Sequence, residues 1–156
     1  DIAFDTKTKE ILVDGENITD QLRKRNVDQR VSLIAKLPNI RKVLVSQQRV
    51  IAGRNDIVMV GRDIGTVVLP GAQYKFYLTA SLEVRAERRY KEFTGYKTKI
   101  LYDEILFEME ERDRVDKSRK DSPLKPAEDA VTVDTTEMSF ETAVGTILNV
   151  IKGTIT

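Results

Sequence analysis

The chain has 156 residues, with 26 basic and 25 acidic side chains and no histidine or cysteine, and 40% of its residues are apolar. This length suits one domain or slightly more, with enough apolar residues for a core, which argues against disorder. The missing cysteine and histidine exclude disulfides, thiolate catalysis and histidine-based triads, and leave a zinc site nearly without ligands. The net charge of +1 argues against a bulk electrostatic grip on nucleic acid. No apolar run reaches the ~20 residues of a membrane span. We therefore expect a globular, cytoplasmic protein that binds neither nucleic acid nor membrane.

The first part of the chain predicts a small subdomain with a hairpin and two helices. Apolar residues alternate between turn signals over 1–19, which is typical of an antiparallel hairpin. Thr19 or Asp20 is the predicted cap of a helix, and apolar residues then recur at helical intervals from Leu22 to Leu37, until Pro38 stops the pattern. A second helix is predicted to begin near Pro38.

The rest of the chain predicts strands that alternate with helices. The strands are expected at 57–60, 74–78 and 131–133, and the helices at 81–93, 100–119 and 139–153. Ser81 and Ser139 are the predicted first caps of the helices at 81–93 and 139–153. Leu101 is expected to lie inward on the helix at 100–119, and the helix at 139–153 has an apolar stripe that begins at Phe140. The run at 57–60 is continuously apolar, which suits a strand buried on both faces. Alternating strands and helices predict parallel pairing and an α/β layer, to which the hairpin and the first two helices are attached.

The loop after the first of these strands is the first candidate site, because ligands of an α/β sheet bind beyond the carboxyl ends of its strands. It reads Gly61-Arg62-Asp63-Ile64-Gly65-Thr66. Arg62 offers a rigid fork suited to phosphate, and Asp63 offers two acceptors suited to an exocyclic amine or a ribose hydroxyl. An ordinary turn with an internal Arg–Asp pair explains these residues equally well.

A second candidate site combines Arg112, Asp116 and Arg119, whose spacings of four and three place them on one face of a helix. Taken alone, this pattern is more often a solvated ion-pair network of small energetic value. Cations near a helix C-terminus also suit the helix dipole.

A third stripe on the helix at 81–93 contains Arg85, Arg88 and Arg89. Glutamates on the same helix are close enough to pair with them, so a solvated face is the favoured interpretation. The segment between this stripe and Arg112, at 90–102, is predicted to be a mobile flap. None of the eight glycines is followed by lysine, so these residues contain no P-loop phosphate cradle.

Taken together, these blocks resemble the bacterial cytidylate kinases. The resemblance covers nearly the whole chain and rests on Asp14-Gly15-Glu16-Asn17-Ile18-Thr19, the stretch 32–41, the block 61–70, the segment 112–119 and Ser122-Pro123-Leu124, in this order. It implies an α/β fold, in which a P-loop-kinase-like parallel sheet is flanked by helices. Residues 1–52 resemble the small α+β monophosphate-binding insert, and 53–156 the C-terminal part of the kinase core, with a lid at about 85–112.

The resemblance also implies a base-binding pocket. By position in the family's motifs, Ser32, Arg41 and Asp63 line the cytosine pocket. The hydrogen-bonding groups of cytosine fit this assignment. Its N4 amine can donate a hydrogen bond to a carboxylate, and its N3 and O2 atoms can accept hydrogen bonds from an arginine.

The remaining roles concern the phosphates and the ribose. Arg62 and Arg119 resemble the arginines that hold the acceptor phosphate, and Asp116 the residue that binds the ribose. Arg112 resembles a lid-side arginine that reaches the transferring phosphoryl group, with Arg85 and Arg89 as further lid candidates. The implied reaction transfers the γ-phosphate of ATP, with Mg²⁺ on the donor phosphates, to CMP or dCMP, and we expect the complete protein to be a monomer.

Two departures from the family pattern affect these expectations. The family begins with a strand, a P-loop ending in Gly-Lys-Gly-Thr and a helix, and none of these is found in the 156 residues. We therefore expect a segment upstream of Asp1 in the kinase and no catalysis by these residues alone. Val60 also stands where the family usually has an acidic residue near the metal.

Two alternatives from other classes stay open. The chain could be a remnant that binds CMP and transfers nothing, and a P-loop upstream would argue against that. The segment 112–120, with five basic and two acidic residues, could bind RNA, although the near-neutral total makes this the weaker hypothesis. RNA affinity with a strong salt dependence would be needed to support it.

Overall fold

The structure, a computed structural model, describes residues 2–5, 7–35, 37–53, 56–95, 100–120 and 122–153. The side chains at positions 4, 23, 25, 28, 29 and 32 lie outside the described part. Contacts divide the chain into two compact units, Asp1–Val43 and Leu44–Thr156. The boundary between the units falls inside the helix α2 (Pro38–Ala52), whereas the sequence predicts a boundary between residues 52 and 53, at the end of that helix.

The first unit begins with a three-stranded antiparallel sheet of β1 (Ile2–Phe4), β2 (Ile11–Val13) and β3 (Glu16–Asn17), in that order. The predicted hairpin is therefore confirmed. Asp14 and Gly15 join β2 to β3 with φ of 50° and 84°. Two successive positive φ values are the mark of the tight turn that matches strand twist, and glycine adopts such values without strain.

The single helix predicted from Thr19 to Leu37 is wrong, because two helical segments replace it. A 3₁₀ helix, η1 (Thr19–Arg23), is followed by α1 (Arg25–Ile34), and the extended backbone of Lys24, with ψ of 137°, separates them. The Thr19 hydroxyl accepts a hydrogen bond from the Ile11 backbone N–H at 2.9 Å. Thr19 therefore joins η1 to β2 and does not cap a long helix. The predicted start of α2 at Pro38 is confirmed.

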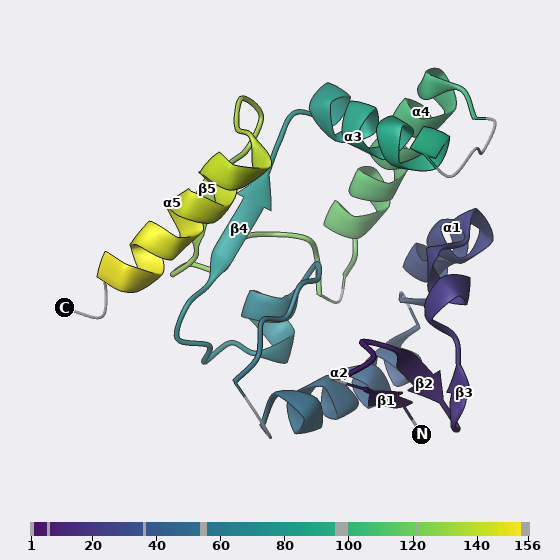
Figure 1. Cartoon of the computed structure of the whole chain (residues 1–156). Coiled ribbons are helices and arrows are strands. Elements are labelled where there is room, and N and C mark those ends of the chain that lie inside the picture. The colour runs from purple at the N-terminus through teal and green to yellow at the C-terminus, as the bar shows by residue number, and fades with distance from the viewer. Residues whose placement is uncertain are drawn as a thin grey trace. The chain divides into compact units, whose positions relative to one another are not determined.

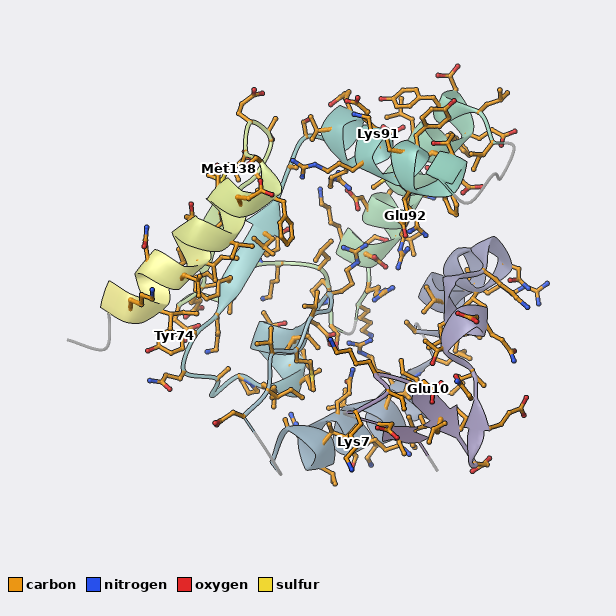
Figure 2. The ribbon with its side chains drawn as sticks, in the orientation of Figure 1. Lys7, Glu10, Tyr74, Lys91, Glu92 and Met138 are labelled. Atoms are coloured by element: carbon orange, nitrogen blue, oxygen red, sulfur yellow. The ribbon has the colours of Figure 1, made fainter. Side chains whose placement is uncertain are left out.

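The second unit contains a parallel two-stranded sheet of β4 (Phe76–Thr79) and β5 (Val131–Asp134), paired from Phe76↔Val131 to Thr79↔Asp134 (Figure 1). Two of the three predicted strands and their parallel pairing are thus confirmed. The helix α5 (Phe140–Gly153) follows β5. Tyr74, labelled in Figure 2, precedes β4, and its hydroxyl donates to the Ile151 carbonyl of α5 at 3.5 Å. This contact shows that α5 runs back along the strands.

The strand predicted at 57–60 is not formed. These residues have no regular secondary structure, and Val58 and Val60 are 93% and 87% exposed. A parallel strand exists only where a neighbour completes its hydrogen-bond ladder and layers cover its faces. Within the described residues the parallel sheet consists of β4 and β5, so this apolar run has no strand beside it.

The main core of the second unit lies between α3 (Leu82–Gly95) and α4 (Tyr102–Lys117). It is formed by Ala86, Phe93, Ile100 and Ile105, with Tyr90, Tyr102, Leu106 and Met109 packed against them. Figure 2 shows the polar residues Lys91 and Glu92 on α3. The predicted inward position of Leu101 is wrong, because its extended backbone precedes the helix and leaves the side chain 68% exposed.

The predicted caps of two helices are confirmed. The Ser81 hydroxyl accepts from the Val84 backbone N–H at 3.2 Å, and the Ser139 hydroxyl accepts from the Thr142 N–H at 3.2 Å. Each bond satisfies one of the donors that a helix N-terminus leaves without an intrahelical partner. In the predicted apolar stripe of α5, Phe140 is 79% exposed, so the stripe does not lie wholly inward.

Candidate functional site

The loop after Val60 folds into a single π-helical turn, η2 (Ile64–Val68), with Asp63 at its start. The Asp63 carbonyl accepts hydrogen bonds from the Val67 and Val68 backbone N–H groups at 2.8 and 3.2 Å. The Asp63 residue is buried, at 6% exposure. π-Helical turns are rare and occur frequently at functional sites, so the geometry is compatible with a site in this loop.

Gly61, at the entrance to this turn, lies close to the side chain of Ile64. A Cβ atom added to Gly61 would lie 2.8 Å from Cγ1 and 2.9 Å from Cδ1 of Ile64. Such distances are shorter than atoms tolerate, so any other residue would displace Ile64.

Three arginines converge on the carboxylate of Asp116, which lies in the last part of α4. The Arg62 Nε lies 3.2 Å from Asp116 Oδ2, and the Arg112 Nε lies 3.9 Å from the same oxygen. The Arg119 guanidinium pairs with Asp116 Oδ1. We call these four residues the Asp116 cluster. The loop at 61–66 and the end of α4 therefore meet in one place.

The structure places Arg112 and Asp116 on the same face of α4, as their spacing predicted. Arg119 lies beyond the end of that helix at Lys117 and folds back onto Asp116. The Leu124 backbone N–H donates to the Asp116 carbonyl at 2.9 Å and holds the returning chain against the helix end. Arg62 joins the cluster from another part of the chain, which helical spacing could not show.

Burial separates the Asp116 cluster from a solvated ion-pair network. The side chains of Asp116 and Arg119 are 1% and 5% exposed, whereas those of Arg62 and Arg112 are 44% and 34% exposed. Buried charges are costly unless they are paired and hydrogen-bonded. The cluster therefore has a buried inner pair and two arginines that are partly exposed to solvent.

The charge of the cluster favours an anion. Three guanidinium groups and one carboxylate leave a local charge of +2. In the described part of the chain, the buried Arg119 Nε has no hydrogen-bond acceptor. Guanidinium groups match phosphate oxygens in geometry and charge, and a phosphate monoester dianion would balance this excess.

The stripe on α3 has its own protein partners. Arg85 pairs with Asp113 of α4 at 2.8 Å and donates from Nε to the Ala80 carbonyl at 3.0 Å. Arg89 pairs with Glu92 at 2.6 Å, and its guanidinium lies 4.4 Å from the centre of the Phe93 ring. A glutamate on the same helix therefore pairs with Arg89, as expected, whereas the aspartate that pairs with Arg85 comes from another helix.

Arg88 joins α3 to the loop after β5. Its Nη2 donates to the Thr135 carbonyl at 2.6 Å, and its Nη1 donates to the Thr135 hydroxyl at 3.0 Å. Residues 96–99 of the predicted flap lie outside the described residues.

The residues predicted to bind cytosine are not all described to the same extent. The side chain of Ser32 lies outside the described part, and Arg41, which is half-buried in α2, belongs to the first unit. Asp63 belongs to the second unit. The pocket that would combine them remains a prediction.

Arg49, in the last turn of α2, was missed by the sequence analysis. Its Nε donates to the Val68 carbonyl at 2.9 Å, and its Nη2 donates to the Val67 carbonyl at 2.7 Å. Apolar periodicity carries no signal for such a contact, because it depends on where a loop distant in sequence returns to the helix.

Among the described residues, no three acidic side chains gather in a way that could hold a metal ion. The helices in that part of the chain are also too short or too polar to cross a membrane.

Comparisons with known proteins identify relatives over almost the whole chain. Residues 1–153 match the family described as cytidylate kinase. A protein named cytidylate kinase from Caldanaerobacter subterraneus subsp. tengcongensis is 45% identical over 152 residues, which are 97% of this chain and 67% of that protein. A cytidylate kinase of Clostridium tetani is 46% identical over 154 residues, 99% of this chain and 68% of the relative. One from Listeria monocytogenes is 46% identical over 148 residues, 92% of this chain and 64% of the relative.

Proposed function

The chain belongs to the cytidylate kinase family, and we propose that it carries the acceptor side of an enzyme that phosphorylates CMP or dCMP with ATP. The observation that carries the proposal is the Asp116 cluster, with its buried inner pair and its excess charge of +2. The positive charge would balance the negative charge of an acceptor phosphate. The products of the proposed reaction are ADP and CDP or dCDP.

In the proposed reaction, the protein supplies position and charge and forms no covalent bond. An oxygen of the CMP phosphate attacks the γ-phosphorus of ATP, and the bond from that phosphorus to the β-phosphate oxygen breaks. Charge gathers on the transferring group, and cationic side chains stabilise it. We assign the acceptor phosphate to Arg62 and Arg119, the ribose to Asp116, and the transferring group to Arg112. Arg85 and Arg89 remain lid candidates.

Base recognition is assigned to Asp63, with Ser32 and Arg41 as partners from the first unit. A carboxylate accepts a hydrogen bond from the N4 amine of cytosine. Uracil has an oxygen in place of that amine and a hydrogen-bond donor at N3. The burial of Asp63 supports this role, because a hydrogen bond is electrostatically stronger away from water. We propose that residues 1–52 bind the monophosphate and that 85–112 include the lid of a P-loop-kinase-like core.

The donor site requires groups that these 156 residues do not contain. No glycine is followed by lysine in this sequence, and we propose that residues outside it supply the backbone cradle and the lysine that hold the β- and γ-phosphates. The chain spans 64–68% of the length of the three relatives described above. Mg²⁺ would be bound mainly by the phosphates of ATP. We expect the complete enzyme to be a monomer.

Calorimetric titration of CMP, UMP and inorganic phosphate tests the acceptor site. We expect CMP to bind more tightly than UMP by about 1–3 kcal/mol for each unsatisfied polar contact. Asp63→Ala should reduce this preference and leave phosphate affinity nearly unchanged, whereas Arg62→Ala should weaken phosphate and both nucleotides alike. Arg114→Ala, which removes an exposed arginine of α4, is the matched control. Equal affinities of the unmodified chain for CMP and UMP would refute the pocket.

An assay coupled to ADP release tests the donor side. We expect turnover in the ordinary kinase range of about 1–100 per second when a P-loop segment precedes the chain, and none from the 156 residues alone. Turnover by those residues alone, at a mass verified by mass spectrometry, would show that they bind ATP without a P-loop.

A further inference from the structure

Arg49 donates two hydrogen bonds to η2, the turn that follows Asp63. Its Nε and Nη2 donate to the carbonyls of Val68 and Val67, at 2.9 and 2.7 Å. Both carbonyls lie at the end of η2. The planar guanidinium is suited to this geometry, because its N–H groups point in fixed directions and can meet two acceptors at once.

These carbonyls require a partner from outside the turn. The last carbonyls of any helical segment have no intrahelical donor, and η2 is only five residues long. At its other end, the Asp63 carbonyl accepts from the Val67 and Val68 backbone N–H groups. The same two residues therefore bond through their N–H groups to Asp63 and through their carbonyls to Arg49.

We propose that Arg49 is a positioning residue that fixes η2 and thereby holds the Asp63 carboxylate where it can read the base. Arg49 acts through the backbone at 67–68. Movement of that backbone would move Asp63, because the hydrogen bonds across η2 join the two. The inference rests on the proposed role of Asp63 in binding the base. It adds Arg49, which is assigned no contact with the base itself.

A purely structural role for Arg49 is the competing explanation. Its position in the last turn of α2 places a positive charge at the negative end of the helix dipole, which stabilises a helix whatever the ligand. Arg49→Lys keeps that charge but replaces the rigid fork by a single ammonium group. Arg49→Gln removes both, and Lys42→Gln removes an exposed charge from the same helix as the control.

The measurement is the ratio of the UMP and CMP dissociation constants, with thermal unfolding followed in parallel. A partly unfolded variant loses affinity for both nucleotides by the same factor, so the ratio reports geometry and not stability. We expect the ratio to fall roughly tenfold in Arg49→Gln, equivalent to one lost hydrogen bond to the base. It should also fall in Arg49→Lys and stay unchanged in Lys42→Gln. A constant ratio in Arg49→Lys and Arg49→Gln would overturn the proposal.

Hydrogen exchange of the backbone amides at 67–69 separates this inference from the proposed function. These amides donate across η2, including Leu69 N–H to the Ile64 carbonyl at 2.7 Å. Faster exchange confined to these amides in Arg49→Gln would support the role of Arg49 in fixing η2. If the unmodified chain showed no preference for CMP, that result would refute only the proposed function. Unchanged exchange there would overturn the positioning role by itself.

Discussion

Removing the charge of Asp116 should destabilise the second unit far more than removing an exposed charge from the same helix. Asp116→Asn keeps the size of the side chain but leaves Arg62, Arg112 and Arg119 without their shared carboxylate. Arg119 is affected most, because its side chain is 5% exposed and cannot turn to water.

The magnitude follows from the exposure of each pair. Loss of one partner from a buried ion pair typically costs about 3–5 kcal/mol, and this applies to Arg119. Arg62 and Arg112 are a third or more exposed, so the loss for each is about 0–1 kcal/mol. Folded proteins are stable by only about 5–15 kcal/mol. The inner pair therefore accounts for most of the effect, and the unfolding midpoint should fall by roughly 6–20 °C.

Urea and thermal unfolding followed by circular dichroism measure this loss. The matched control is Glu111→Gln, which breaks a pair with Arg114 on the same helix whose side chains are 42% and 67% exposed. That variant should lose less than about 1 kcal/mol. If Asp116→Asn lost no more than the control, the burial argument would be refuted.

Phosphate provides a second readout for the same variant. The substitution raises the local charge from +2 to +3, so inorganic phosphate should restore the stability of Asp116→Asn to a greater degree than it stabilises the unmodified chain. CMP should restore less stability to Asp116→Asn than its phosphate group alone would, because the proposed contact between Asp116 and the ribose is lost. Failure of phosphate to restore any stability would contradict an anion site at this cluster.

Three further predictions test local features. Gly61→Ala should displace Ile64 and weaken CMP binding by calorimetry, and unchanged affinity would show that the turn adapts without moving the site. Ser81→Ala should cost about 1 kcal/mol in urea unfolding through the lost cap of α3, whereas no loss would mean that water replaces the cap. Hydrogen bonds from the Thr136 hydroxyl and backbone N–H hold the pKa of Asp134 below its usual value. Thr136→Val should therefore raise that pKa in an NMR titration, and an unchanged value would contradict the hydroxyl's role.

The parts of the fold that sequence predicted well depend on short-range chemistry. Ser81 and Ser139 cap their helices because a hydroxyl at that position meets the free N–H groups whatever lies nearby. The turn at Asp14-Gly15 is equally local. The single helix predicted from Thr19 is interrupted at Lys24, whose extended backbone separates η1 from α1. The Thr19 hydroxyl bonds to β2, and such a contact lies outside any helical window.

The strand predicted at 57–60 failed for a different reason. A continuous apolar run records that burial on both faces would be favourable, but the neighbouring strand and the covering layers must be present for a ladder to form. In the described residues β4 pairs with β5, and Val58 and Val60 remain exposed. Hydrophobicity therefore predicted the kind of environment that these residues favour and could not predict whether that environment exists.

For the candidate site too, the sequence predicts the spacing of the residues but not their burial. The spacing of Arg112 and Asp116 places them on one face of a helix, but a solvated network and a ligand site share that spacing. The structure shows that Asp116 is buried and that Arg62 and Arg119 reach it from outside the helix, so the network around it is not a fully solvated one. A buried ion pair gives little stability compared with apolar residues of similar volume. A cluster that also has two excess positive charges is therefore better explained by an anion that it binds than by the stability of the fold.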